Sequence, residues 1–173
     1  AVGCEFSFVF NALGTEVTLV EMMPTLINVM DADLGAELGK LFGRQGIKVK
    51  TGASLEKVER VGNAWKCTVK RGTETEEIEV DVLLLGVGRK AATDGVNLES
   101  IGVKLHRRGV EVVDDTLVTH VPHIYAIGDV TGRIQLAHTA MHEGVVAAQN
   151  IVKSERKQAK YKAVPNAVYT HPE

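Results

Sequence analysis

The most informative polar residues of this sequence stand directly behind short apolar runs. Glu21 follows the β-branched run 16–20, and Gly128-Asp129 follows the apolar segment 124–127. A carboxylate at the end of a strand can accept hydrogen bonds from sugar-type hydroxyls, and a glycine beside it lets the backbone approach a polyol or a phosphate. Both patterns predict binding sites for a ligand that carries such groups.

Gly3 and Glu21 together fit a dinucleotide-binding pattern. Gly3 is interpreted as the third glycine of Gly-x-Gly-x-x-Gly, which permits close helix–strand packing and opens a helix that faces a pyrophosphate. Glu21 lies near the spacing of roughly 20 residues at which a carboxylate holds the adenosine ribose. Such a carboxylate repels a 2′-phosphate, which favours NAD over NADP. A surface glutamate after an ordinary strand remains the alternative.

A second glycine-rich segment, Gly86-Val87-Gly88-Arg89, follows the apolar run 82–85. Glycines at the carboxyl end of a buried parallel strand allow a ligand to reach the backbone, because open α/β sheets bind at that edge. A plain turn from strand to loop explains the same residues equally well.

The cysteines and histidines predict no catalytic or metal site. Cys4 and Cys67 are too far apart in sequence for a CxxC motif, and we expect two buried thiols. His138 and His142 are four residues apart on a predicted helix, a spacing that allows two ligands to one metal. No evident third ligand accompanies them, so a zinc site is not expected.

The elements that position these residues alternate between helix and strand in the first half. A helix begins at Val2, with Gly14 suited to its C-cap, and the strand 16–20 follows. A second helix is expected within 31–46, capped by an aspartate, before the strand 47–50. This alternation predicts an α/β fold with a parallel sheet, whose first strand we expect to precede Ala1.

An antiparallel insertion is expected next. The runs 55–61, 65–70 and 75–80 read as a meander joined by two glycine-containing turns. The apolar run 82–85 is then expected to return to the parallel sheet.

The second half begins after a loop at 91–95. A short strand at 110–114, a buried strand ending at Gly128-Asp129 and a long helix over 135–152 are expected there. The packing residues predicted for that helix are Leu136, Ala140, Val145, Ala147, Ala148, Ile151 and Val152. The predicted regions are a nucleotide-binding domain at 1–90, part of a second domain at 91–160 and the start of a third at 161–173.

Charge and hydropathy exclude two classes of partner. The formal charge of the 173 residues is −2 with both signs interspersed, so the sequence lacks the basic stripe that nucleic-acid binding requires. No apolar run approaches the roughly 20 residues of a membrane span. We therefore expect neither nucleic acid nor a membrane as partner, and a cytoplasmic setting.

Five motifs carry a family resemblance. They are Val-Gly-Cys-Glu-Phe at 2–6, Leu-Gly-Thr-Glu-Val-Thr-Leu-Val-Glu at 13–21, Gly-Val-Gly-Arg at 86–89, Ile-Tyr-Ala-Ile-Gly-Asp-Val at 124–130 and Leu-Ala-His-Thr-Ala-Met-His-Glu-Gly at 136–144. In this order the chain resembles the pyridine-nucleotide disulfide oxidoreductases, and most of all their dihydrolipoamide dehydrogenase branch. The resemblance implies a Rossmann-like FAD/NAD(P)-binding fold followed by part of a second, FAD-binding domain.

The resemblance also assigns cofactor contacts. It implies that Glu21 holds the NAD ribose, that the loop at Gly88 lies against NAD, and that Asp129 after Gly128 binds the ribityl or pyrophosphate region of FAD. The stretch Leu136-Ala137-His138 is implied to lie beside the flavin. The helix start is the remaining part of the implied cofactor site: Val2, Gly3 and Glu5.

The implied reaction is oxidation of a protein-bound dihydrolipoyl dithiol, with electrons passing through FAD to NAD⁺. A homodimer and a lipoyl-bearing acyltransferase of a 2-oxo acid dehydrogenase complex are the implied partners. The family's redox cysteine pair and its His–Glu acid–base pair match no residue here, so the chain alone is expected to be inactive. Lys90-Ala91-Ala92 departs from the family's Pro-Asn after Gly-Arg.

Three alternatives remain open. A related reductase for glutathione or mercuric ion shares the motifs, a non-catalytic NAD-binding module would need no catalytic residues, and a two-dinucleotide monooxygenase shares the fold.

Overall fold

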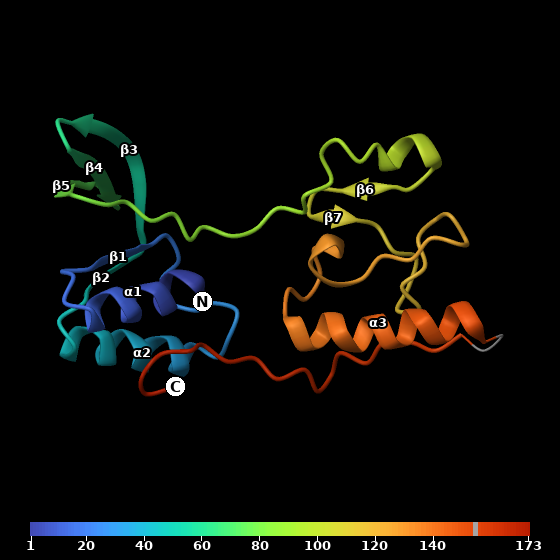
Figure 1. Ribbon diagram of the computed structural model, residues 1–173. Helices are drawn as coiled ribbons and strands as arrows, with labels where there is room; N and C mark the ends of the chain where they lie inside the picture. Colours follow the sequence, from blue (N-terminus) through green and yellow to red (C-terminus); the bar gives the residue numbers. More distant parts are fainter. Residues whose placement is uncertain (154–155) are drawn as a thin grey trace. The chain divides into compact units, whose positions relative to one another are not determined.

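The computed structural model describes residues 1–153 and 156–173, which form two compact units (Figure 1). Residues 1–87 and 167–173 make up the first unit, and residues 88–166 the second. The sequence had placed a boundary after residue 90, and the units divide between Val87 and Gly88. Residues 167–173, expected at the start of a third region, lie with the first unit.

The first unit contains a parallel strand pair covered by two helices. Its elements are α1 (Val2–Ala12), β1 (Thr18–Glu21), α2 (Ala32–Arg44) and β2 (Lys48–Thr51). β1 and β2 pair in parallel, with Leu19 opposite Val49. Phe42 of α2 is 1% exposed and packs in a core that also includes Cys4 of α1 and Leu38 of α2. The predicted α/β alternation is therefore confirmed.

The predicted meander is also confirmed. β3 (Ala53–Val61), β4 (Ala64–Arg71) and β5 (Glu74–Val80) form an antiparallel sheet in the order β3-β4-β5 (Figure 1). Cys67 and Val69 of β4 are both buried, as the alternating pattern requires.

The predicted strand at 82–85 is wrong. All four residues are described, and none is paired in a sheet. Val82 is 79% exposed and Leu85 is 66% exposed. A fully apolar strand is stable where neighbouring strands and covering helices bury it. Within the described residues the parallel sheet holds β1 and β2 alone, and residues 82–85 pair with neither strand.

The second unit has little regular sheet. Its elements are η1 (Leu98–Ile101), β6 (Leu105–His106), β7 (Gly109–Val110), η2 (Gly128–Thr131) and α3 (Ala137–Val152). The strands expected at 110–114 and before Gly128 are wrong: apart from Val110 in β7, these segments form only isolated bridges, Val112 to Thr119 and Val118 to Tyr125. Turns interrupt the pairing: Leu117 N–H donates to Asp114 O at 3.1 Å, and Ile124 N–H donates to Val121 O at 2.9 Å.

The buried face of α3 differs from the predicted one. Val145 and Ile151 are 56% and 65% exposed, whereas Glu143 is fully buried beside Val146 and Ala147. The helix uses polar side chains on its inner face because the loops packed against it present backbone groups that need partners. None of the described helices combines the length and hydropathy that a membrane span requires.

Candidate functional site

Two glycines approach each other at the start of α1 in the first unit. A Cβ built on Gly86 would lie 3.2 Å from both the N and Cα atoms of Gly3. A Cβ on Gly3 would meet Leu19 Cδ1 at 3.6 Å, an ordinary contact. Close packing at the helix start therefore depends more on Gly86 than on Gly3, to which the sequence had assigned it. This close approach brings the segment after residues 82–85 against the N-terminus of α1.

Glu21 is the last residue of β1, at the carboxyl end of the parallel pair. Its Oε1 accepts a hydrogen bond from the backbone N–H of Met23 at 2.8 Å. That bond fixes the side chain at the edge where open α/β sheets bind ligands, and its other oxygen can still accept from a hydroxyl.

The other residues predicted at the start of α1 differ in surroundings. Val2 is 39% exposed. Glu5 accepts a hydrogen bond from the backbone N–H of Tyr169 at 3.1 Å, so its carboxylate holds the segment 167–173.

Burial raises the pKa of the Cys4 thiol, and the carboxylates of Glu21 and Glu5 raise it further. Cys4 is therefore a protonated, buried thiol, as the sequence predicted.

Gly128 in the second unit occupies a backbone conformation that only glycine adopts without strain. Its φ is +68°, and a Cβ there would lie 3.0 Å from the Cβ of Ala140 on α3. The turn that presents Asp129 therefore needs both a glycine at 128 and a small residue at 140.

Buried side chains hold both backbone groups of Gly128. Its N–H donates to Glu143 Oε2 at 2.6 Å, and its carbonyl accepts from Thr131 Oγ1 at 2.8 Å. Glu143 and Thr131 are 0% exposed. The N–H of Gly132 closes the turn by donating to the Asp129 carbonyl at 3.0 Å. The orientation of Asp129 is thus fixed from several directions.

The Asp129 carboxylate itself faces outward. Its side chain is 47% exposed, and Oδ2 lies 3.3 Å from Nη1 of Arg89. A hollow of about 450 Å³ opens beside it, lined by residues 89–92, 129–130 and Gln135. Gly88, at φ +122°, leads into this segment. The second unit therefore brings the Gly-Arg motif and the Gly-Asp motif together, as one site.

The stretch Leu136-Ala137-His138 forms the start of α3. Leu136 is the N-cap residue and has an extended backbone, with φ −129° and ψ 135°. As an apolar residue, it donates or accepts no capping hydrogen bond with its side chain. A helix N-terminus offers backbone N–H groups and a partial positive charge to an anion. His138 Nε2 lies 3.1 Å from the carbonyl oxygen of Pro165.

The His138–His142 pair is not part of a metal cluster. His142 Nε2 accepts from the backbone N–H of Lys160 at 3.5 Å. Within residues 1–153 and 156–173, no three His, Cys, Asp or Glu side chains are grouped so that they could hold a metal ion.

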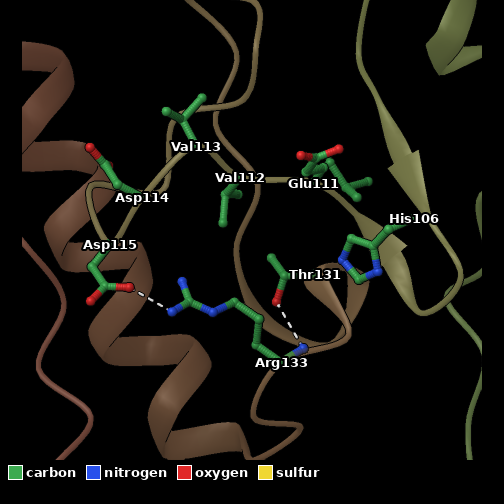
Figure 2. A pocket seen from close by; sticks show the side chains of 9 residues that line it. His106, Glu111, Val112, Val113, Asp114, Asp115, Thr131 and Arg133 are labelled. Atoms are coloured by element: carbon green, nitrogen blue, oxygen red, sulfur yellow. Dashed lines mark hydrogen bonds and ion pairs between the residues drawn. The ribbon is translucent and has the colours of Figure 1, made fainter.

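Behind the Asp129 turn lies a second hollow of about 250 Å³ (Figure 2). Several of its polar groups already have partners: Arg133 Nη2 lies 2.5 Å from Asp115 Oδ1, and His106 Nδ1 accepts from Arg108 N–H at 3.1 Å. The backbone N–H of Arg133 donates to Thr131 Oγ1 at 3.4 Å, as the dashed line in Figure 2 shows. The residues that line this hollow therefore help to hold the turn in place.

Sequence reasoning missed several residues of the second site. Arg89, Thr131 and Glu143 had no predicted role, and Ala140 was predicted only as a packing residue of the helix. A usable signal existed for Glu143, because it stands in the middle of a predicted apolar-faced helix at a spacing of four from both Thr139 and Ala147. A charged residue on that line of positions indicates a buried hydrogen-bonding role.

The two sites fit different parts of dinucleotide cofactors. In the second unit, the Asp129 carboxylate and the Arg89 guanidinium border one hollow with Gln135, which directly precedes the N-cap of α3. This combination suits sugar-type hydroxyls and phosphates. In the first unit, Glu21 offers a ribose acceptor at the carboxyl edge of the strand pair. No residue of either site is a nucleophile or an acid–base pair.

Comparison with known proteins identifies the family of this chain. Residues 1–144 match the family model for pyridine nucleotide-disulphide oxidoreductases. The chain is 38% identical over 172 residues to a dihydrolipoyl dehydrogenase of Chlamydia muridarum, covering 99% of this chain and 36% of that protein. It is 40% identical over 176 residues to that of Thermus scotoductus, covering 100% and 38%. The chain thus spans a little over a third of the length of these relatives.

Solved structures show the same similarity. The HOCl-induced flavoprotein disulfide reductase RclA of Escherichia coli superposes with a TM-score of 0.86 at 27% identity, covering 99% of this chain and 39% of that one. LpdA of Mycobacterium tuberculosis superposes with a TM-score of 0.87 at 28% identity, covering 98% and 36%. The family model covers well over half of the sequence, and the predicted fold is that of these neighbours. The chain belongs to the pyridine nucleotide-disulphide oxidoreductase family.

Proposed function

We propose that this chain is the cofactor-binding part of a dihydrolipoamide dehydrogenase, a flavoprotein that passes electrons from a dihydrolipoyl dithiol through FAD to NAD⁺. The carrying observation is the Gly128-Asp129 turn. Its backbone is fixed by two fully buried side chains, yet its carboxylate points outward. A turn held this firmly around an exposed acceptor is suited to orient the hydroxyls of a bound ligand.

In this proposal Asp129 accepts hydrogen bonds from the ribityl or pyrophosphate-proximal hydroxyls of FAD. Arg89, 3.3 Å from Asp129, supplies positive charge next to the phosphates, and the start of α3 supplies backbone N–H groups. Leu136-Ala137-His138 flanks the flavin. Bound FAD would take up the electrons of the dithiol and give them to NAD⁺.

Glu21 and the start of α1 hold NAD in the same proposal. The Glu21 carboxylate binds the adenosine ribose, and the N-terminus of α1, against which Gly86 packs closely at Gly3, faces the pyrophosphate. A 2′-phosphate at Glu21 would meet a negative charge, so NAD is preferred to NADP. Val2 and Glu5 border this cofactor, whereas Gly88 belongs to the second unit, and the expectation that it lies against NAD stays a prediction.

Substrate and partners follow from the relatives that are named dihydrolipoyl dehydrogenases. We infer a lipoyl group on an acyltransferase of a 2-oxo acid dehydrogenase complex as the electron donor, a homodimeric enzyme and a cytoplasmic location. The described residues include neither a redox cysteine pair nor an acid–base pair. The proposal therefore assigns to this chain the binding of cofactors and not the thiol chemistry.

A disulfide reductase for a different acceptor is the second candidate. Its support is the superposition on RclA, whose name describes a flavoprotein disulfide reductase, at a TM-score of 0.86. Glu21 favours NADH over NADPH as reductant in that case as well.

The test is a cofactor and substrate assay on the intact protein. We expect stoichiometric FAD after gel filtration, NAD⁺ reduction with dihydrolipoamide, and little activity with NADP⁺. A protein that binds FAD but ignores dihydrolipoamide while reducing another disulfide with NADH would favour the second candidate. A protein without flavin would contradict both.

A further inference from the structure

Glu143 is a fully buried carboxylate in the middle of α3. A buried carboxylate is costly unless it is paired or hydrogen-bonded. Glu143 receives two hydrogen bonds, one on each oxygen and each from a different part of the chain. The N–H of Gly128 donates to Oε2 at 2.6 Å, and the hydroxyl of Tyr161 donates to Oε1 at 2.8 Å.

The bond from Gly128 joins α3 directly to the turn that carries Asp129. The carbonyl of Gly128 is held by Thr131, so Glu143 and Thr131 anchor the two peptide groups that flank the Gly128 Cα. Without it, the Gly128 N–H would be buried with no acceptor, and the turn would move to find one.

The bond from Tyr161 fixes the position of the carboxylate itself. Arg133 lies over the Tyr161 ring at 4.6 Å from its centroid and pairs with Asp115 at 2.5 Å. Burial raises the pKa of the Tyr161 phenol, and its hydrogen bond to Glu143 raises it further. The phenol is therefore protonated at neutral pH and acts as a donor.

We propose that Glu143 is a positioning residue for flavin binding, which fixes the Gly128-Asp129 turn through the Gly128 amide and is itself seated by Tyr161. Glu143 does not touch the cofactor. The inference rests on the proposed function, in which Asp129 binds FAD. Its consequence is that the affinity for FAD depends on a side chain buried behind the site.

The main test is the dissociation constant for FAD of the apo form of the intact protein, measured by flavin fluorescence. Glu143→Ala should weaken binding about tenfold or more, because the apparent affinity falls with the fraction of molecules whose turn is in the binding geometry. Glu143→Asp should behave like alanine, since its carboxylate is one methylene too short. Glu143→Gln keeps an acceptor oxygen and should lose about threefold.

Asn150→Ala is the matched structural control. Asn150 lies on the same buried face of α3, and its side-chain amide donates to the carbonyls of Thr116 and Lys157. Its loss should lower the unfolding temperature as the Glu143 substitutions do, while the affinity for FAD changes less than twofold. Affinity for NADH should stay unchanged in all variants, because Glu21 and α1 lie in the other unit.

Tyr161→Phe provides a milder test if the Glu143 variants fail to fold. It removes one donor to Glu143 and should weaken FAD about threefold and speed hydrogen exchange at the Gly128 amide. Unchanged FAD affinity in both Glu143→Gln and Tyr161→Phe, or equal losses in Asn150→Ala, would overturn the positioning role. A wild-type protein that binds no FAD would instead contradict the proposed function.

Discussion

The two units of this chain build their sites by different means. In the first unit, the buried set within the described residues is apolar apart from Ser7, and Glu21 stands at the end of a paired strand. In the second unit the buried set includes six polar residues: Thr116, Thr119, Thr131, Thr139, Glu143 and Asn150. Helices and ladders satisfy much of the backbone in the first unit, whereas buried side chains also bind backbone groups in the second, at Gly128, Thr116 and Lys157.

This difference predicts which kind of substitution harms each unit. Apolar truncation should be most damaging where packing alone holds the elements together. Loss of a buried polar group should be most damaging where it is the partner of a loop backbone. The predictions below test that contrast, and they are ordered by the size of the expected effect.

Phe42→Ala should cause the largest loss of stability. Phe42 is 1% exposed in the core of the first unit, and truncation of a buried phenylalanine costs about 3–5 kcal/mol. Amide hydrogen exchange should show faster opening throughout 1–87, with protection in the second unit retained. Equal loss of protection in residues 88–166 would show that the units unfold together.

Gly128→Ala should have the next largest effect, about 1–3 kcal/mol, with loss of FAD binding. A side chain there is strained at φ +68° and lies 3.0 Å from the Ala140 Cβ. Gly62→Ala is the matched control, because its φ is +61° and a Cβ would meet nothing within 4 Å. Denaturant unfolding of both variants separates backbone strain from the clash. Equal losses would mean that the contact with Ala140 is unimportant.

Glu21→Arg should change cofactor preference with little change in stability. The substitution removes a ribose acceptor and replaces repulsion of a 2′-phosphate with attraction, so the NADH to NADPH preference should fall about tenfold or more. Stability should change by about 1 kcal/mol or less, because the substitution removes one hydrogen bond, from the Met23 N–H, that water can replace in part. The ratio of kcat/KM values for the two cofactors measures the effect. An unchanged ratio would remove Glu21 from the NAD site.

The first unit was largely predictable from its sequence because local patterns decide its elements. The 3.6-residue apolar period of α1 and the strict alternation in β4 each match the observed helix and strand. The exception, the apolar run 82–85, shows the limit of such patterns. An apolar run indicates that a segment can be buried in a sheet. Whether it pairs depends on neighbouring strands that come from other parts of the chain.

The second unit was predictable in its motifs and not in its structure. Gly128-Asp129 was identified, yet the strand expected before it is a chain with isolated bridges. The backbone of this turn is hydrogen-bonded by side chains that lie further along the sequence, such as Glu143, which accepts from the Gly128 N–H. Hydropathy misassigned the inner face of α3, because a buried glutamate is favourable only when a specific donor faces it, and one sequence does not reveal that donor.

The smallest predicted effects concern two exposed carboxylates, one in each unit. Asp114 accepts from the Thr116 hydroxyl and from the Thr116 backbone N–H, and these bonds lower its pKa from the ordinary 3.8. Glu16 pairs with Lys48, whose hydrogen bond and charge lower the pKa of Glu16 from 4.5. In both cases the ionised form favours folding, so the contribution is present above the ordinary pKa and is lost as pH falls through the folded-state pKa.

Asp114→Asn should cost about 0.5 kcal/mol or less at pH 7, because the side chain is exposed and asparagine retains an acceptor oxygen. The donors to Asp114 are neutral groups of Thr116, whereas Glu16 depends on a charge that salt screens. Urea unfolding should be measured at about 0.05 M and about 1 M salt. The higher salt concentration should erase the loss of stability caused by Glu16→Gln and leave the loss caused by Asp114→Asn. If the higher salt concentration abolished the effects of both substitutions, the turn at Asp114 would be stabilised by long-range charge. The proposed contrast between the two exposed carboxylates would then be wrong.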